Sequence, residues 1–111
     1  MSIEQMLFMA NKEYSFKGNK INYHTLKEFK NIKIYTESSH FDRKLKQDSL
    51  GNLYLYEFYE YVSFGNDGDE IYETYTLVRD ECDADILNKQ KDIRRKPYIR
   101  VNPGFYFNIV E

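Results

Sequence analysis

Residues 53–64 read LYLYEFYEYVSF, and this stretch limits the fold more than any other part of the sequence. Nine of its twelve side chains are apolar or aromatic, and four of those are tyrosine. Successive side chains of a strand point to opposite faces of its sheet. A strand here therefore carries large side chains on both faces. The question is then which of the two faces forms the core and what the other face contacts.

Residues 71–79, IYETYTLVR, predict a second strand that returns beside the first. Asp67-Gly68 between them is the strongest two-residue hairpin sequence in the chain. A loop of those two residues would pair Phe58 with Leu77. One face would then hold Phe58, Val62, Phe64, Ile71 and Leu77. The other would hold Tyr59, Tyr61, Ser63, Tyr72, Thr74, Thr76 and Val78.

We expect the first of these faces to be core and the second to be an exposed surface. Tyrosine suits such a surface because it offers a broad contact area with few rotatable bonds. The alternative is a covering helix, since Tyr and Thr are also ordinary strand residues. Glu57 and Glu60 interrupt the apolar pattern, which predicts a bulge near residues 57–60.

The remaining elements follow from capping sequences and periodicity. Ser2 with Gln5 predicts an N-terminal helix that ends near Lys12, and Thr25 with Glu28 predicts a short helix through about Asn31. Asp83 can cap a helix over 83–93. A hairpin is expected over 14–23 around Gly18-Asn19, with further strands at 32–38, 41–47, 97–101 and 105–110. Over 41–47, Phe41, Arg43 and Leu45 share one face.

Together these elements predict an α+β fold, mostly antiparallel, with hairpins and about five to seven strands. The length of 111 residues suits a single domain, 1–111. Aromatic residues make up 17% of the chain, far more than disordered chains contain.

The sequence also suggests a compartment and an origin. It contains no apolar run of the roughly 20 residues that a membrane helix needs. Its start lacks the features of a signal peptide, and its single cysteine, Cys82, forms no disulfide framework. We expect a cytoplasmic protein with no membrane partner. Phe, Tyr, Met, Ile, Asn and Lys outnumber Gly, Ala, Arg and Pro by 51 to 14, a codon skew that suits a phage or mobile element of an A+T-rich genome.

Charge is segregated along the chain although its net value is only −2. Residues 11–46 hold nine basic against four acidic residues, residues 47–92 three against twelve, and residues 93–111 four against one. We expect the acidic middle to pair with the basic flanks inside the domain. The alternative is an acidic surface that meets a basic partner or mimics nucleic acid.

The densest basic cluster is KQKDIRRK, residues 89–96, extended by Arg100. These side chains could bind the phosphates of nucleic acid through Lys89, Lys91, Arg94, Arg95 and Arg100. The simpler interpretation is that Lys91, Arg94 and Arg95 complement the dipole at the end of the predicted helix.

Catalytic and metal sites find little support in the sequence. His40 and Asp42 share a strand face, but no nucleophile is marked beside them, and His24 is distant in sequence. Cys82 lies among carboxylates, which disfavour a reactive thiolate, and we expect a small buried side chain there. We therefore predict no cofactor, no metal site and no catalytic residues.

The leading functional hypothesis is a small non-catalytic protein that binds another protein. It would act stoichiometrically, as an inhibitor or accessory factor of a phage or mobile element, through Tyr59, Tyr61, Tyr72, Thr74 and Thr76. The alternative is a protein that binds single-stranded nucleic acid or nucleotides through Lys and Tyr of residues 14–35 together with residues 89–100. A small enzyme is the least favoured. A homodimer is compatible with each of these.

Overall fold

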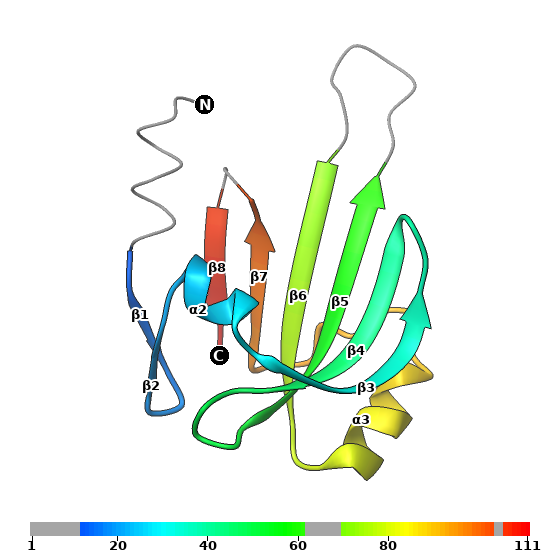
Figure 1. Ribbon diagram of the computed structural model, residues 1–111, viewed down its shortest axis with the longest axis horizontal. Helices are drawn as coiled ribbons and strands as arrows, with labels where there is room; N and C mark the ends of the chain where they lie inside the picture. The colour runs from blue at the N-terminus through cyan, green and yellow to red at the C-terminus, as the bar shows by residue number, and fades with distance from the viewer. Residues whose placement is uncertain (1–11, 62–69, 104–105) are drawn as a thin grey trace.

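The computed structural model describes residues 12–61, 70–103 and 106–111, and within them it contains two antiparallel sheets and two short helices (Figure 1). The larger sheet has six strands in the order β3-β4-β5-β6-β7-β8, so each strand pairs with the next one in the chain. Their bounds are β3 Lys30–Glu37, β4 Phe41–Gln47, β5 Leu53–Tyr61, β6 Glu70–Val78, β7 Tyr98–Asn102 and β8 Tyr106–Val110. The mostly antiparallel architecture is as predicted. The expected N-terminal helix, the Asp67-Gly68 tip and Gly104 of the last turn lie outside the described residues.

The smaller sheet is the hairpin of β1 Tyr14–Phe16 and β2 Asn19–Ile21. Phe16 faces Asn19, so the loop is Lys17-Gly18, one residue earlier than predicted. Both loop residues have positive φ, +50° and +79°, as the favoured two-residue hairpin turn requires.

The helix that follows, α2 Tyr23–Lys27, begins earlier than the sequence predicted. Asn22 is its N-cap: its side chain accepts a 2.9 Å hydrogen bond from the Thr25 amide, and the Thr25 hydroxyl accepts one of 2.7 Å from the Asn22 amide. Thr25 therefore closes a capping box instead of opening one with Glu28.

The register between β5 and β6 differs from the predicted one. Phe58 faces Glu73, where Leu77 was expected, and Tyr59 faces Tyr72. The shift is four residues, and because four is even, every side chain of β5 and β6 stays on its predicted face; Val62, Ser63 and Phe64 lie outside the described residues. The predicted bulge near residues 57–60 is wrong, since β5 pairs without interruption on both sides. The irregularities of pairing lie in β3 instead.

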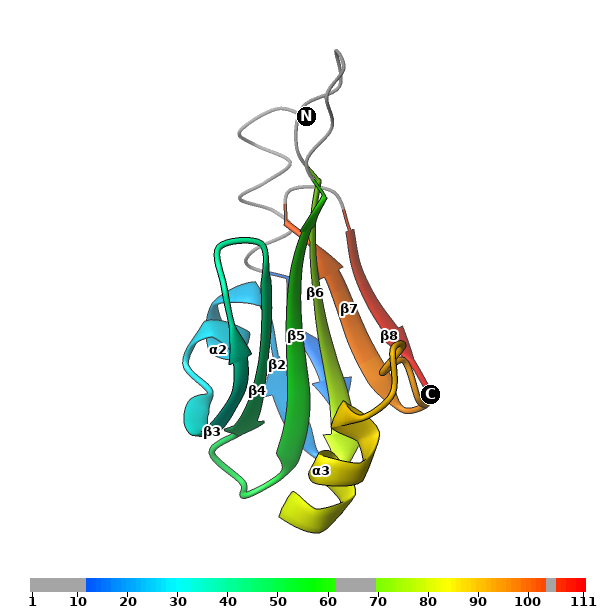
Figure 2. The same cartoon turned by 90° about the vertical axis from the view of Figure 1, so that its right-hand side faces the viewer.

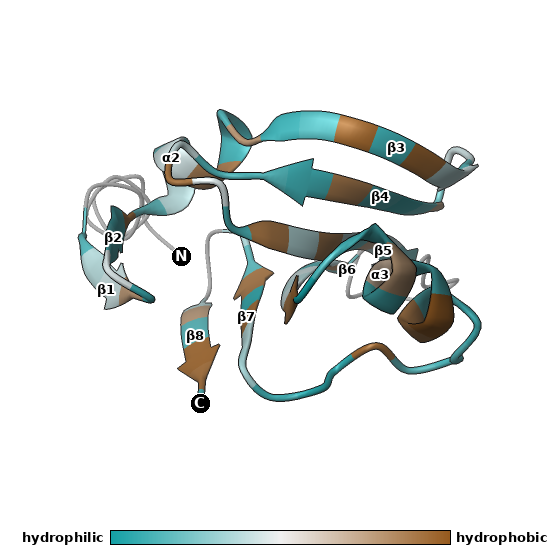
Figure 3. Ribbon diagram, turned by 90° about the horizontal axis from the view of Figure 1, so that it is seen from below, coloured by the Kyte–Doolittle hydropathy of each residue, from teal (hydrophilic) through white to brown (hydrophobic). Residues whose placement is uncertain are grey.

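Both faces of the large sheet carry a core, so the prediction of one buried and one exposed face is wrong. The hairpin β1-β2 and α2 cover one face, which we call the hairpin face (Figure 2). Its buried cluster contains Phe16, Ile21, Leu26, Phe29, Tyr54, Tyr56, Tyr75, Ile99 and Val101. The second helix, α3 Glu81–Asn88, covers part of the other face, the helix face, and the apolar segments of α3 and β5 lie together in Figure 3. The cluster there contains Leu45, Leu55, Val78, Ala84, Leu87 and Ile93.

Helix α3 is shorter than the predicted helix over 83–93, and it begins and ends earlier. Asp80, not Asp83, is the N-cap and accepts a 2.8 Å hydrogen bond from the Asp83 amide. The helix ends at Asn88, and its last turn contains no basic residue. The interpretation of Lys91, Arg94 and Arg95 as charges that complement a helix dipole is therefore wrong.

Opposite charges from distant parts of the chain pair within the domain, as expected. Arg43 binds Glu57 across β4 and β5, Lys27 of α2 binds Glu73 of β6, and Lys33 of β3 binds Asp85 of α3. Within the described residues, neither helix is long and apolar enough to cross a membrane.

Candidate functional site

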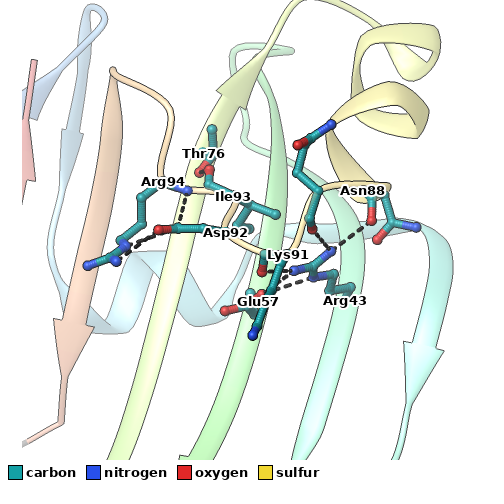
Figure 4. A network of polar contacts seen from close by, with 9 residues as sticks. Arg43, Glu57, Thr76, Asn88, Lys91, Asp92, Ile93 and Arg94 are labelled. Atoms are coloured by element: carbon teal, nitrogen blue, oxygen red, sulfur yellow. Dashed lines mark hydrogen bonds and ion pairs between the residues drawn. The ribbon is translucent and has the colours of Figure 1, made fainter.

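The candidate site is built around Arg43, a buried arginine on the helix face of β4 (Figure 4). Its guanidinium donates to Glu57 Oε2 at 2.9 Å and to three backbone carbonyls at the end of α3 and just after it. Those carbonyls belong to Asn88, Gln90 and Lys91, at 2.8, 2.7 and 2.8 Å. Arginine suits this position because its planar group donates in several fixed directions at once. Arg43 thus ties the segment after α3 to the sheet.

A second polar contact holds the same segment further along. The Thr76 hydroxyl of β6 donates to the Ile93 carbonyl at 2.6 Å, and both residues are almost completely buried. Ile93 packs in the core of the helix face, so residues 88–93 leave the helix and cross the sheet (Figure 4). Two buried side chains of the sheet therefore position a segment with no regular secondary structure.

This segment forms one wall of an open hollow of about 860 Å³ on the helix face, which we call the groove. Phe41, Arg43, Glu57 and Tyr59 form its floor on β4 and β5, and Arg100 of β7 lies on its far side. The wall consists of Asn88, Lys89, Gln90, Lys91, Asp92 and Arg94. Five basic and two acidic residues line the groove, a formal charge of +3 in a chain of net charge −2.

The structure brings together four of the five basic residues that the sequence singled out for nucleic acid. Lys89, Lys91, Arg94 and Arg100 all line the groove. Arg94 also binds Asp92, and these hydrogen bonds lower the pKa of Asp92 to about 2, so that both groups are charged at neutral pH. Arg95 does not belong to the groove, because its guanidinium binds Asp83.

The five residues predicted as a protein-binding surface are divided by the structure. Tyr59 and Tyr61 are exposed, at 40% and 52%, and Tyr59 forms part of the groove floor. Tyr72 is half-buried, and the guanidinium of Arg100 lies 4.8 Å from its ring centroid. The hydrogen bond that Tyr72 donates to Glu70 raises the pKa of its hydroxyl.

Thr74 and Thr76, by contrast, are buried, at 2% and 0% exposure, and so they are not part of an accessible surface. The reason is the register of the sheet, which places them in its centre between β5 and β7. The segment 88–93 then passes over Thr76. The predicted surface is therefore smaller than expected, and it adjoins the basic cluster.

Sequence reasoning missed Phe41 and Arg43 as parts of the site. It placed them on one strand face with Leu45, and that placement is confirmed by the burial of Arg43 and Leu45. The signal was an arginine between two apolar residues on the same face. Such a residue must find several acceptors when it is buried.

The residues considered for catalysis lie apart from the groove. His24 lies in α2, and His40 lies in the turn before β4 with Nδ1 3.4 Å from the carboxylate of Glu60. Asp42, expected to join His40, accepts a hydrogen bond from the Ser38 amide. Cys82 is exposed and not buried as predicted. Among the described residues, no group of three or more His, Cys, Asp or Glu is arranged to hold a metal ion.

Comparisons of the chain with models of protein families, with curated proteins and with solved structures find no match. The function must therefore be argued from the groove itself.

Proposed function

We propose that this protein is a non-catalytic binding protein and that the groove holds single-stranded nucleic acid. The observation that carries this proposal is the meeting of the exposed ring of Tyr59 with Lys89, Lys91, Arg94 and Arg100 in one hollow. Proteins that bind single strands combine a basic channel for phosphates with aromatic side chains on which unpaired bases stack.

The basic side chains of the groove differ in whether an acidic side chain of the protein pairs with them. Arg43 is neutralised by Glu57, and Arg94 shares its charge with Asp92. Lys89, Lys91 and Arg100 form no ion pair with any acidic group of the described residues. Three to four cations are therefore available to phosphate oxygens.

The preference for a single strand follows from the floor of the groove. Tyr59 can stack only on a base whose face is exposed, and the bases of a duplex are already stacked on each other. The charge distribution supports the same ligand. A positive groove on a protein of net charge −2 attracts a polyanion to this face. The acidic groups on the other surfaces of the protein disfavour binding of the polyanion there.

The test is the binding of a fluorescently labelled oligothymidylate, followed by anisotropy at several salt concentrations. If about three phosphates are neutralised, the logarithm of the binding constant should fall against the logarithm of salt with a slope of about −2. Lys91→Gln should lower the affinity and make the slope shallower by about 0.7. Tyr59→Ala should lower the affinity by about tenfold or more and leave the slope unchanged.

The matched control for the lysine variant is Lys20→Gln, which removes an exposed lysine of β2, in the hairpin on the opposite face. This variant should bind the oligonucleotide as the original chain does. The proposal is wrong if the original chain fails to bind at low salt, or if the control and Lys91→Gln weaken binding equally.

A second candidate is a protein partner, favoured by the exposure of Tyr59 and Tyr61 next to the half-buried Tyr72 and Arg100. Tyr and Arg are the residue types that contribute most to protein interfaces. In this version the protein acts stoichiometrically on a host protein, as an inhibitor or accessory factor of a phage or mobile element.

The two candidates differ in their dependence on salt. An interface built on tyrosine should keep its affinity at salt concentrations that release an oligonucleotide. A pull-down from the source cells at high salt, with Tyr59→Ala/Tyr61→Ala as the comparison, tests the second candidate. Capture that survives the double substitution would exclude this surface.

A further inference from the structure

A second hollow, of about 480 Å³, is lined by the start of β5, the end of β6 and the segment that enters β7. These strand ends lie at the lower end of the large sheet in Figure 1. We call this hollow the basal pocket. Arg79, Arg95 and Lys96 are its charged lining residues, and Leu53, Val78 and Pro97 supply apolar surface. No acidic side chain is among the described residues that line it.

The basic cluster at 89–96 is divided between the two hollows. Arg94 lines the groove and binds Asp92, whereas Arg95 lines the basal pocket and binds Asp83. Lys96 is exposed in the basal pocket and pairs with no acidic group of the described residues. A cluster that is continuous in sequence therefore supplies two separate positive sites.

The arginines of the basal pocket are oriented by one buried carboxylate. Arg95 donates to both oxygens of Asp83, at 3.0 and 2.7 Å, and also to the Leu77 carbonyl at 3.3 Å. Arg79 lies 3.6 Å from the same carboxylate, and its side chain is 85% exposed. The hydrogen bonds from Arg95 hold the pKa of Asp83 well below its usual range, so Asp83 is charged at neutral pH.

The charges in contact within this cluster do not cancel. Arg79, Arg95 and Lys96 carry three positive charges, and the one carboxylate that the two arginines contact, Asp83, carries a single negative charge. A charge of +2 remains beside apolar surface. A phosphate monoester matches this arrangement, because it carries close to two negative charges at pH 7 and presents three acceptor oxygens.

We propose that the basal pocket binds the phosphate group of a small phosphate monoester between Arg79, Arg95 and Lys96. The organic group of the ester lies against Leu53, Val78 and Pro97. This site is separate from the groove and takes a small molecule instead of a polymer, so it stands or falls independently of the function proposed above.

The probe is phenyl phosphate, titrated to about 10 mM into the ¹⁵N-labelled full chain at constant ionic strength, because a Kd near 1 mM saturates in that range. We expect saturable shifts of the amide signals of Asn52, Val78, Arg79 and Lys96. Inorganic phosphate should shift the same signals with lower affinity, because it lacks the apolar group. Phenol, which lacks the phosphate, should not bind.

Two variants and a matched control make the test specific. Arg79→Gln and Lys96→Gln each remove an exposed cation, so the fold should survive, and each should weaken phenyl phosphate binding by about tenfold. Lys20→Gln removes an exposed lysine of β2 that lines neither the groove nor the basal pocket, and it should leave this binding unchanged. Absence of saturable shifts, equal binding by all three variants, or shifts confined to the groove would each overturn the proposal.

Discussion

Replacing Arg43 by methionine removes the guanidinium that ties residues 88–91 to the sheet and keeps most of the apolar stem. The side chain of Arg43 is 7% exposed, and its four hydrogen bonds end on Glu57 and on three backbone carbonyls. Removal of one partner from a buried ion pair typically costs about 3–5 kcal/mol. Glu57 is 19% exposed and the carbonyls can reach water if the segment lifts, so we expect a loss near the lower end, about 3 kcal/mol.

Denaturation in urea, followed by far-ultraviolet circular dichroism, measures this loss, and the thermal midpoint should fall by roughly 10–20 °C. The same variant should lose affinity for the oligonucleotide, because the wall of the groove is no longer held. Arg79→Met is the matched control. Its side chain is 85% exposed and its ion pair is long, so the change should cost at most about 1 kcal/mol. Equal stabilities of the two variants would refute the assignment of Arg43 as the anchor of the groove.

Three further predictions each concern a single residue. Thr76→Val leaves the buried Ile93 carbonyl without its donor and should lower the free energy of unfolding by about 1–3 kcal/mol, measured in urea; an unchanged midpoint would show that this hydrogen bond contributes nothing. Asp83 has a pKa in the folded state below its ordinary 3.8, chiefly because Arg95 binds it, so its ionised form stabilises the fold above about pH 4, and this contribution disappears as the pH falls toward the folded-state pKa. Asp83→Asn should therefore lose stability less steeply between about pH 5 and pH 2 than the original chain, and parallel curves would contradict the argument. Gly18→Ala should lower the free energy of unfolding by about 1–2 kcal/mol, because φ at this position is +79°, a conformation that strains the backbone of alanine. No atom lies within 4 Å of the added Cβ, so no steric clash adds to this cost. A variant with an unchanged turn and an unchanged free energy of unfolding in urea would contradict the argument.

The strands were largely predictable because their signals are local. Residues 41–47 match β4, and the alternation of Phe41, Arg43 and Leu45 correctly gave the face that they share. The faces of β5 and β6 were also assigned correctly, although the register was wrong by four residues. Side-chain direction depends only on whether a shift is even or odd, so this error left the face of each residue unchanged.

The helix boundaries were less predictable, because two residues could serve as the cap. Asp80 and Asp83 have the same side chain, and both precede residues of helical period. The carboxylate of Asp83 is buried and accepts hydrogen bonds from Arg95, a residue twelve positions away, and Asp80 is therefore the N-cap. Ile93 likewise lies outside the helix, because its side chain packs in the core of the helix face. Neither contact is visible within a short window of sequence.

The candidate site shows the same division. The sequence named its chemical groups, the tyrosines of β5 and the basic residues of 89–100, but it treated them as two separate surfaces. Only the fold places Tyr59 in one groove with Lys91 and Arg100. Only the fold buries Thr74 and Thr76, in the centre of the sheet between β5 and β7.

By itself, the amino-acid sequence determined which segments are strands and which side chains share a face, because backbone geometry repeats every two residues along a strand. The tertiary structure decided which of those faces are covered, since each covering layer comes from segments outside the strands that it covers, α2 with the hairpin on one side and α3 with residues 88–93 on the other. It also decided where charge remains available, because a buried arginine such as Arg43 is neutralised by its neighbours, whereas an exposed lysine such as Lys91 is not.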